Sequence, residues 1–499
     1  MQRLLGFFFL LLAACGDPSP ESAVVHPPTG PLIGSREAGV SAFRAIPYAA
    51  PPMGARRFQP PAPAAVWTDP RPATDVGPGC PQQMGEAYLG QEDCLTLDVW
   101  TPVTDPEEPL PVMVWLHGGG LVQGGGPDAM NDGRVLARDA EVVVVMVQYR
   151  LGALGYLGDP SLRDERGAVG NYGLLDQLAA LRWVRENIGA FGGDPARVTL
   201  FGSSAGGASV VALASMPAAD GLFDGVIVQS APAAWGLPAP EEAAARAQPL
   251  VDAVGCGGDE RERAACLRAV PAETLVRASA SDDEGLLGPG GASLVVDGVV
   301  LAEQPIDGLG DRPQRRWLVG TNREEAGVIR LLPLTALLGS PELYGAAVGE
   351  LFGEDAAALL EVYPASAFDD PTEALVTLLT ERFFTCPNLA LQDARPGSAG
   401  YRFTHRLRGE PAALGAFHSL EIATLFGTLS PELGGAYAGY AEAPADARAG
   451  ELLRSVWGRF AHGAMPIAAG AHVDLDEEPV PWTADEPALL RCRALEGLR

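Results

Sequence analysis

Residues 202–206, Gly-Ser-Ser-Ala-Gly, place a serine at the centre of a pattern that suits nucleophilic chemistry. The apolar, β-branched run 198–201 predicts a buried strand, and the small and aliphatic residues 207–214 predict a helix. A strand that becomes a helix within a few residues needs a sharp bend, and the flanking glycines let neighbouring backbones approach. The pattern therefore predicts that Ser204 is an exposed nucleophile at the carboxyl end of a sheet, although the bare motif also arises by chance in glycine-rich chains.

A serine hydroxyl is a weak nucleophile, so it needs a base, an acid to orient that base, and donors for the developing oxyanion. Residues 111–116 predict a second buried strand, which runs directly into His-Gly-Gly-Gly at 117–120. Such a loop exposes bare backbone N–H groups and accompanies the serine turn in lipases and esterases. We assign the oxyanion donors to the N–H groups of Gly119, Gly120 and Ala205. The alternative is a flexible surface loop.

Further short stretches along the chain serve as landmarks: residues 43–52, 92–100, 149–152, 171–177, 191–195, 229–230 and 457–461. In these stretches and their order the chain resembles the type-B carboxylesterases, a family of carboxylesterases, cholinesterases, some fungal lipases and the non-catalytic neuroligins. The resemblance covers roughly residues 31 to 499 and implies an α/β class of fold, the α/β-hydrolase fold, with a mostly parallel central sheet flanked by helices. Helical insertions, predicted at roughly 239–280 and 334–395, would form a gorge over the active site.

The resemblance also implies the other two members of a catalytic triad, which α/β-hydrolases carry in the order Ser, Asp or Glu, His. Residues 316–325 predict a strand and a polar turn similar to the family's G-x-N-x-D-E-G, whose second carboxylate corresponds to Glu325. Its neighbour Glu324 is the alternative. His418 lies in a stretch similar to the family's G-A-x-H-x-x-E and corresponds to the base, the alternative being an ordinary loop histidine. His405 ends a strand-like run and is interpreted as structural or exposed.

The implied mechanism is hydrolysis of a carboxylic ester through an acyl-enzyme on Ser204, without a metal or an organic cofactor. The chain departs from the family at Ser203, where glutamate is usual. A neutral residue there removes a negative charge close to the site. We therefore expect a weaker preference for cationic substrates and an altered pKa of the base.

The N-terminus indicates export. Residues 1–14 combine one positive charge with an apolar run too short to span a bilayer, as in a signal peptide. The run ends Leu-Ala-Ala-Cys, which resembles the bacterial lipoprotein box, so Cys15 is the predicted lipidation site. Residues 15–30 are predicted to be a flexible tether and 31–499 the catalytic domain. The expected location is the bacterial cell envelope, with a membrane-anchored lipoprotein favoured over a periplasmic or secreted protein. The alternative is an ordinary cleaved signal with an incidental cysteine.

The chain has seven cysteines, and reserving Cys15 for lipid leaves six for three bridges. The resemblance implies the pairs Cys80–Cys94 and Cys256–Cys266, and a third pair, Cys386–Cys492, as in cholinesterases. An oxidising compartment permits all three. The rival interpretation, unpaired buried thiols in a cytosolic protein, conflicts with the signal segment.

The composition favours one large catalytic domain, because 47% of the 499 residues are hydrophobic and no repeat interrupts them. The formal net charge is −28, which disfavours nucleic acid as a partner. This acidity could attract cationic substrates, but a solvated surface explains it more simply. The expected partner is a small-molecule ester, with membrane contact through the lipid anchor alone. The sequence carries no signal for an oligomeric state.

The loop between Cys80 and Cys94 argues against choline esters as the substrate class, because it lacks a tryptophan. Residues 81–93 contain no tryptophan, whereas the corresponding loop of cholinesterases carries the choline-binding tryptophan. We therefore expect a general esterase for small or medium uncharged esters, with a lipase or polyester hydrolase as the alternative. A non-catalytic, neuroligin-like binding protein is the alternative from another class, but such proteins lose the nucleophile.

Overall fold

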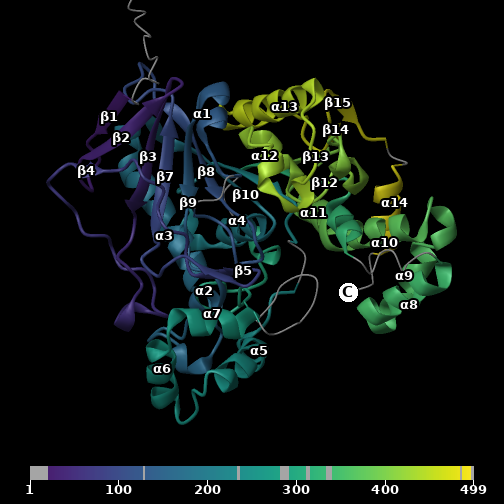
Figure 1. The fold of residues 1–499 in the computed structure, drawn as a ribbon, viewed down its shortest axis with the longest axis horizontal. Helices are drawn as coiled ribbons and strands as arrows, with labels where there is room; N and C mark the ends of the chain where they lie inside the picture. Colours follow the sequence, from purple (N-terminus) through teal and green to yellow (C-terminus); the bar gives the residue numbers. More distant parts are fainter. Residues whose placement is uncertain are drawn as a thin grey trace, which may run out of the picture.

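The computed structural model describes residues 21–126, 130–232, 236–280, 292–310, 315–332, 340–483 and 486–495. A 13-stranded sheet crosses the molecule in the order β1-β2-β3-β7-β9-β8-β10-β11-β12-β13-β14-β15, with β4 paired to β2 (Figure 1). The strands of this sheet are β1 Glu21–Val25, β2 Leu32–Glu37, β3 Val40–Pro47, β4 Arg71–Pro72, β7 Thr96–Thr101, β8 Leu110–Leu116, β9 Val143–Val147, β10 Gly193–Ser203, β11 Gly225–Gln229, β12 Arg316–Asn322, β13 Ala399–Phe403, β14 His472–Leu475 and β15 Pro479–Pro481.

The sheet is antiparallel at its amino-terminal edge and parallel through its centre. Strands β1, β2, β3, β7 and β9 pair antiparallel in succession, whereas every pairing from β9–β8 to β13–β14 is parallel. A separate hairpin is formed by β5 (Gln82–Met84) and β6 (Ala87–Leu89). Because the carboxyl ends of parallel strands meet at one edge, the loops that follow β8, β10 and β12 gather there.

Helices cover both faces of the sheet and also form two peripheral groups. The α-helices are α1 Arg134–Ala140, α2 Gly152–Tyr156, α3 Tyr172–Asn187, α4 Ala205–Ser215, α5 Pro240–Ala253, α6 Glu260–Ala269, α7 Ala272–Ala280, α8 Pro341–Phe352, α9 Ala356–Val362, α10 Pro371–Thr380, α11 Cys386–Asp393, α12 Leu420–Phe426, α13 Pro444–Ala461 and α14 Pro487–Ala494. A π-helix, Glu381–Thr385, joins α10 to α11. Short 3₁₀ turns span Gly54–Arg56, Pro160–Leu162, Ile188–Phe191, Pro217–Ala219, Asp307–Leu309, Glu325–Leu331, Gly353–Asp355, Ala365–Ala367, Glu410–Leu414, Pro431–Leu433 and Gly435–Tyr437.

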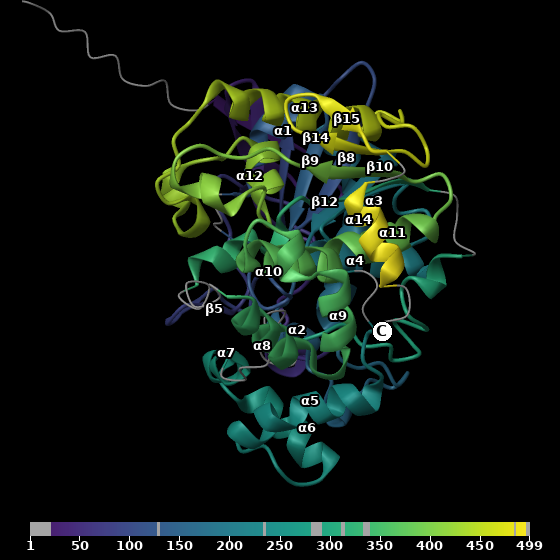
Figure 2. The ribbon, with the colours of Figure 1, turned by 90° about the vertical axis from the view of Figure 1, so that its right-hand side faces the viewer.

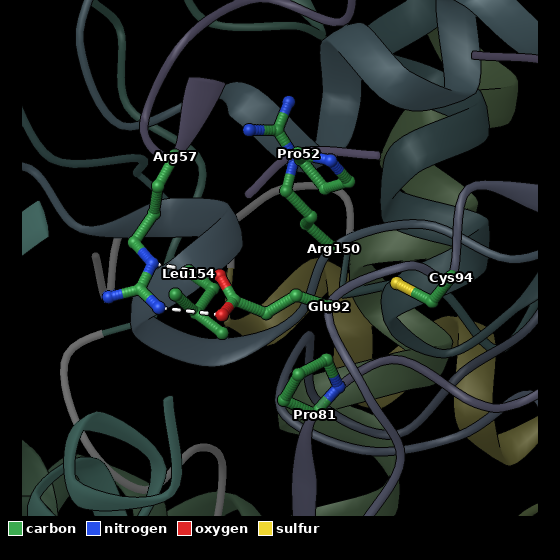
Figure 3. Close-up of a pocket in the computed structure, with 7 residues that line it drawn as sticks. All are labelled: Pro52, Arg57, Pro81, Glu92, Cys94, Arg150 and Leu154. Carbon is green, nitrogen blue, oxygen red and sulfur yellow. Dashed lines mark hydrogen bonds and ion pairs between the residues drawn. The ribbon is translucent and has the colours of Figure 1, made fainter. Parts of the chain in front are cut away.

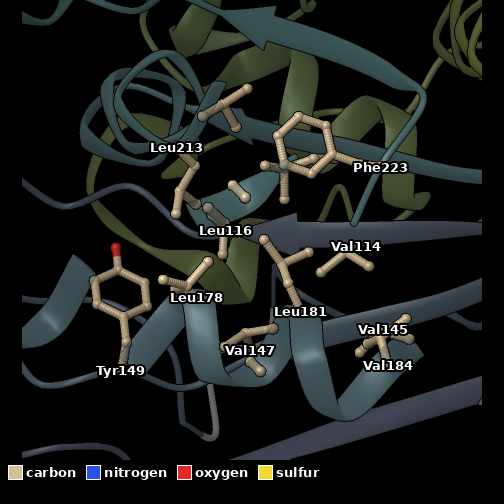
Figure 4. Packing of buried hydrophobic residues seen from close by; sticks show 14 of the residues in the cluster. Val114, Leu116, Val145, Val147, Tyr149, Leu178, Leu181, Val184, Leu213 and Phe223 are labelled. Carbon is tan, nitrogen blue, oxygen red and sulfur yellow. The ribbon is translucent and has the colours of Figure 1, made fainter. Parts of the chain in front are cut away.

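Strand β8 shows how the sequence produces a core on each face of the sheet. Its alternate residues point to opposite sides, so a fully apolar strand faces two separate clusters. On one side Val114 and Leu116 pack with apolar residues of α3 and α4, including Leu178 and Leu213 (Figure 4). On the other side Trp115 packs with residues of α1, α12 and α13. The central strands are therefore buried on both faces.

The two peripheral helical groups each have a core of their own. Helices α5, α6 and α7 lie at one end of the molecule, opposite α12 and α13 (Figures 1 and 2). Helices α8, α9 and α10 form the second group. The predicted helical insertions at 239–280 and 334–395 correspond to these groups within the described residues. The three predicted disulfides are also present: Cys80–Cys94, Cys256–Cys266 and Cys386–Cys492.

The predicted tether over residues 15–30 is wrong in its second half. Residues 21–25 form strand β1, which pairs in register with β2 from Glu21↔Arg36 to Val25↔Leu32. The ordered domain thus begins ahead of residue 31, because β-branched and apolar side chains in this segment extend the antiparallel edge of the sheet. The predicted signal peptide and Cys15 lie outside the described residues. Within the described part of the chain, no helix has the length and apolar character needed to cross a membrane.

A buried ion pair joins Arg150, which follows β9, to Asp176 in α3. Its contribution to the stability of the fold can be tested. Arg150 donates to Asp176 through Nε and Nη2, each at 2.7 Å, and both side chains are almost fully buried. Removing the carboxylate leaves a buried guanidinium without its counterion, so we expect Asp176→Ala to destabilise the fold by about 3–5 kcal/mol.

Urea unfolding followed by circular dichroism measures this loss. The matched control is Glu273→Ala, which breaks the solvent-exposed Arg277–Glu273 pair and should leave the unfolding midpoint nearly unchanged. Equal, small effects of the two substitutions would contradict the role assigned to the buried pair.

Candidate active site

Ser204 stands at the turn between β10 and α4, and its backbone is strained. Its φ and ψ are 58° and −125°, outside the regions that non-glycine residues prefer. The turn is held because the Ser204 N–H donates to the Gln229 carbonyl of β11 at 2.9 Å. A side chain at position 206 would place its Cβ 2.1 Å from the Leu116 carbonyl oxygen, so only glycine allows α4 to approach β8 this closely. The side chain of Ser204 remains partly exposed.

The glycine loop lies beside this turn because β8 and β10 are parallel neighbours, with Leu116 paired to Gly202. Gly119 and Gly120 adopt φ values of 103° and 63°, which a side chain would disfavour. Their N–H groups make no hydrogen bond to any residue that the structure describes. Ala205 is the first residue of α4, where a backbone N–H has no partner within the helix. None of the three predicted oxyanion donors therefore has a hydrogen-bond partner among the described residues.

Glu325 and His418 are in direct contact. His418 Nδ1 lies 2.6 Å from Glu325 Oε2, and the His418 N–H donates to the Glu325 carbonyl at 3.1 Å. The other carboxylate oxygen of Glu325 accepts from the Asn322 N–H at 2.6 Å. The Glu325 side chain is fully buried, and the hydrogen bonds to its two carboxylate oxygens hold it in one orientation. The imidazole can therefore present only Nε2 to a substrate.

The neighbouring carboxylate, Glu324, has a different role. It accepts from the Ala416 N–H at 2.8 Å and pairs with Arg406, so it fixes the loop that leads to His418. His405 is buried rather than exposed, and its two ring nitrogens lie 2.6 and 2.7 Å from Asp476 and Asp446. Of the two alternatives for this histidine, the structural one fits these contacts.

A third buried carboxylate, Glu421, connects the segments that carry Ser204, Glu325 and His418. Its Oε1 accepts from Ser203 Oγ at 3.1 Å and from Gln229 Nε2 at 3.2 Å. Its Oε2 accepts from Asn322 Nδ2 at 2.5 Å. The sequence motif contained Glu421, but its role was not predicted, because Glu421 lies in α12 and its partners lie on three strands, β10, β11 and β12.

This carboxylate changes the expectation attached to Ser203. The neutral serine does lack the usual glutamate's charge, yet it places its hydroxyl on Glu421, so a carboxylate still lies next to the serine turn. Burial and the nearby Glu325 raise the pKa of Glu421, while the Asn322 hydrogen bond opposes that rise. Burial alone would lower the pKa of His418, but the Glu325 carboxylate outweighs it and the pKa is raised above its usual value.

The imidazole of His418 also packs on an aromatic ring, since its centroid lies 4.9 Å from that of Phe384. Ser204 and His418 are not hydrogen-bonded to each other among the residues that the structure describes. Such contacts are often loose without substrate and tighten when it binds. Across the same residues, no group of three or more His, Cys, Asp or Glu side chains is arranged to hold a metal ion.

The strand order, the parallel centre of the sheet and the strand-to-helix turn at Ser204 define an α/β-hydrolase. The chain belongs to the Carboxylesterase family, whose family model matches residues 21–485. It is accordingly a carboxylic ester hydrolase.

Relatives cover nearly the whole chain. It is 37% identical over 421 residues to the para-nitrobenzyl esterase of Bacillus subtilis (strain 168), covering 80% of this chain and 82% of the relative. It is 32% identical to the phenmedipham hydrolase of Pseudarthrobacter oxydans, covering 94% of both. Among solved structures, a Geobacillus stearothermophilus carboxylesterase superposes with a TM-score of 0.80 at 32% identity, covering 94% of this chain and 99% of that one.

The Glu325–His418 contact predicts how the imidazole titrates. In the native protein we expect the pKa of His418 to lie above the usual value of about 6.5. Glu325→Gln removes the main charge that favours the imidazolium and leaves burial, which disfavours it, opposed only by the weaker effect of Glu421, so the pKa of His418 should fall. The ring protons can be followed by NMR against pH, because the chain has only six histidines and His418→Gln identifies the signal. An unchanged titration in Glu325→Gln would contradict this coupling.

Proposed function

We propose that the chain hydrolyses carboxylic esters through an acyl-enzyme on Ser204. Nε2 of His418 takes the hydroxyl proton as the serine oxygen bonds to the ester carbonyl carbon, and the N–H groups of Gly119, Gly120 and Ala205 bind the resulting oxyanion. His418 then gives the proton to the departing alcohol oxygen as its bond to carbon breaks. Water repeats these steps on the acyl-enzyme and releases the acid. Glu325 orients His418 and stabilises its protonated form.

The 2.6 Å contact between His418 Nδ1 and the buried Glu325 carboxylate is the observation that carries this proposal. It leaves Nε2 as the nitrogen that can serve a substrate. Two further observations support the remaining roles: the strained backbone of Ser204, and the N–H groups of Gly119 and Gly120, which have no partner in the part of the chain that the structure describes. A non-catalytic binding role gains no support from the chain, because it retains all three side chains.

For the substrate, we propose small or medium uncharged esters. The Cys80–Cys94 loop has no tryptophan to hold a quaternary ammonium group, and relatives that cover most of the chain bear the names of para-nitrobenzyl esterase and fumonisin B1 esterase. A lipase or polyester hydrolase of the same family is the alternative, because the Phe384 ring beside His418 offers an apolar surface to the acyl group.

A p-nitrophenyl ester series from acetate to palmitate tests both points. Ser204→Ala removes the nucleophile, so we expect kcat to fall by about 10⁴-fold or more while the circular dichroism spectrum stays native. Ser215→Ala is a matched control, since it removes a serine hydroxyl that donates to the Ala212 carbonyl at the other end of α4 and should retain near wild-type activity. Substantial turnover by folded Ser204→Ala would contradict the mechanism, and a palmitate optimum would favour the lipase alternative.

We also propose that the protein is exported and anchored through a lipid on Cys15. The support is the apolar N-terminal run ending in Leu-Ala-Ala-Cys together with the three disulfides, which persist in oxidising compartments.

Expression of the full chain in a bacterial host tests the anchor. We expect the wild type to fractionate with membranes, to be released by detergent but not by high salt, and to incorporate labelled palmitate. Cys15→Ser should lose the label and leave the membrane fraction, whereas Cys15-independent membrane retention would contradict the proposal. Ester hydrolysis in each fraction checks that the released protein is folded.

A further inference from the structure

Gln82, at the start of the β5–β6 hairpin, uses both polar atoms of its side-chain carboxamide to bind backbone groups of Gly124 and Cys80. Its Oε1 accepts from the Gly124 N–H at 2.8 Å, and its Nε2 donates to the Gly124 carbonyl at 3.0 Å. The same Nε2 donates to the Cys80 carbonyl at 3.1 Å. The side chain is almost fully buried, so water cannot easily replace these bonds. Gln82 therefore clamps Gly124 to the base of the disulfide loop.

Gly124 in turn lies directly against the start of the glycine loop. A side chain at position 124 would place its Cβ 2.5 Å from His117 Nδ1 and 2.6 Å from the Gly118 carbonyl oxygen. These two atoms are themselves 2.9 Å apart. Burial lowers the pKa of His117 to about 4, so its ring is neutral near pH 7 and Nδ1 donates to the Gly118 oxygen. The position of Gly124 thus limits where this hydrogen bond can lie.

This hydrogen bond sets the direction of the Gly119 N–H. The Gly118 carbonyl and the Gly119 N–H belong to one trans peptide and point in opposite directions. Holding the carbonyl on His117 therefore turns the N–H away from that ring. Gly118 also touches the serine turn, since a Cβ there would lie 3.1 Å from the Cβ of Ser204. The peptide that supplies one predicted oxyanion donor is thus held between His117 and Ser204.

The loop that carries Gln82 is itself firmly fixed. The Cys80–Cys94 disulfide closes it, and Arg57 binds Glu92 near its other end through two hydrogen bonds of 2.8 and 2.6 Å (Figure 3). Arg57 also donates to the Val270 carbonyl at 2.5 Å, beside α6. The loop that carries Gln82 is therefore fixed at both ends, by the disulfide and by the contacts of Arg57.

We propose that Gln82 is a positioning residue for the oxyanion loop: through Gly124 it holds the Gly118–Gly119 peptide in the orientation that binds the transition state. The inference rests on the proposed function, in which the Gly119 N–H is an oxyanion donor. Removing one such donor outright costs about 10²–10³ in kcat, so loosening one should cost about ten- to a hundredfold.

The test compares Gln82→Met, which keeps the length of the side chain but loses all three hydrogen bonds, with Gln83→Met in the same hairpin. Among the described residues, the Gln83 side chain hydrogen-bonds only to the nearby Gly85 carbonyl, at 2.8 Å, and its variant should behave as wild type. For Gln82→Met we expect kcat to fall about ten- to a hundredfold while KM changes by less than about threefold. An alkyl trifluoromethyl ketone, which forms a tetrahedral oxyanion on serine, should bind more weakly by the same factor.

A purely structural role would instead lower the melting temperature without this matched loss of kcat and inhibitor binding. Gln82→Glu retains the acceptor for the Gly124 N–H but cannot donate, and it provides the same comparison if Gln82→Met does not fold. Folded variants of Gln82 with wild-type kcat and inhibitor affinity would overturn the inference. Failure of the proposed function would look different, because wild-type hydrolysis itself would then not depend on Ser204.

Discussion

The close approach of α4 to β8 is the constraint on which the rest of the site depends. It exists because position 206 has no side chain: a Cβ there would lie 2.1 Å from the Leu116 carbonyl oxygen. The contact forces the chain to reverse at Ser204 with a positive φ. It also brings the glycine loop that follows Leu116 against the same turn. The unfavourable backbone conformation of Ser204 persists because β10 is paired on both sides, with β8 and β11. The stability of the sheet thus holds Ser204 at the carboxyl end of β10.

Glu421 is the second element of this arrangement, because it links segments that are distant in sequence. Ser203 and Glu421 are 218 positions apart, yet a hydrogen bond of 3.1 Å joins them. Asn322 donates to Glu421 through its side chain and to Glu325 through its backbone, so both carboxylates are held by one residue. Trp457 Nε1 donates to Gln229 Oε1 at 3.2 Å, so both polar atoms of the Gln229 carboxamide are paired within this buried cluster. Among the described residues, Asn322 Oδ1 is the polar side-chain atom of the Glu421–Asn322–Gln229 group that has no hydrogen-bond partner.

Much of this could be predicted from the sequence, because the signals are local. The turn at Ser204 and the glycine loop each follow an apolar strand, and the adjacent carboxylates and His418 lie in short recognisable stretches. The Ser203–Glu421 bond and the Gln82 clamp could not be predicted, since they depend on which side chains the sheet brings together across long separations. Strand β1 was missed for a related reason: its pairing with β2 is a property of the sheet edge, whereas the proline-rich segment around it favours a tether.

The most direct test of the account is to locate the covalent bond that the proposed mechanism requires. A fluorophosphonate captures an activated serine, and tandem mass spectrometry of the labelled peptide can distinguish Ser203 from Ser204 by cleavage between them. The account predicts a single adduct, on Ser204, whose rate of formation falls at least about 10²-fold in His418→Gln, because the base that activates the hydroxyl is gone. An adduct on Ser203 or on another residue, or labelling that does not depend on His418, would contradict it.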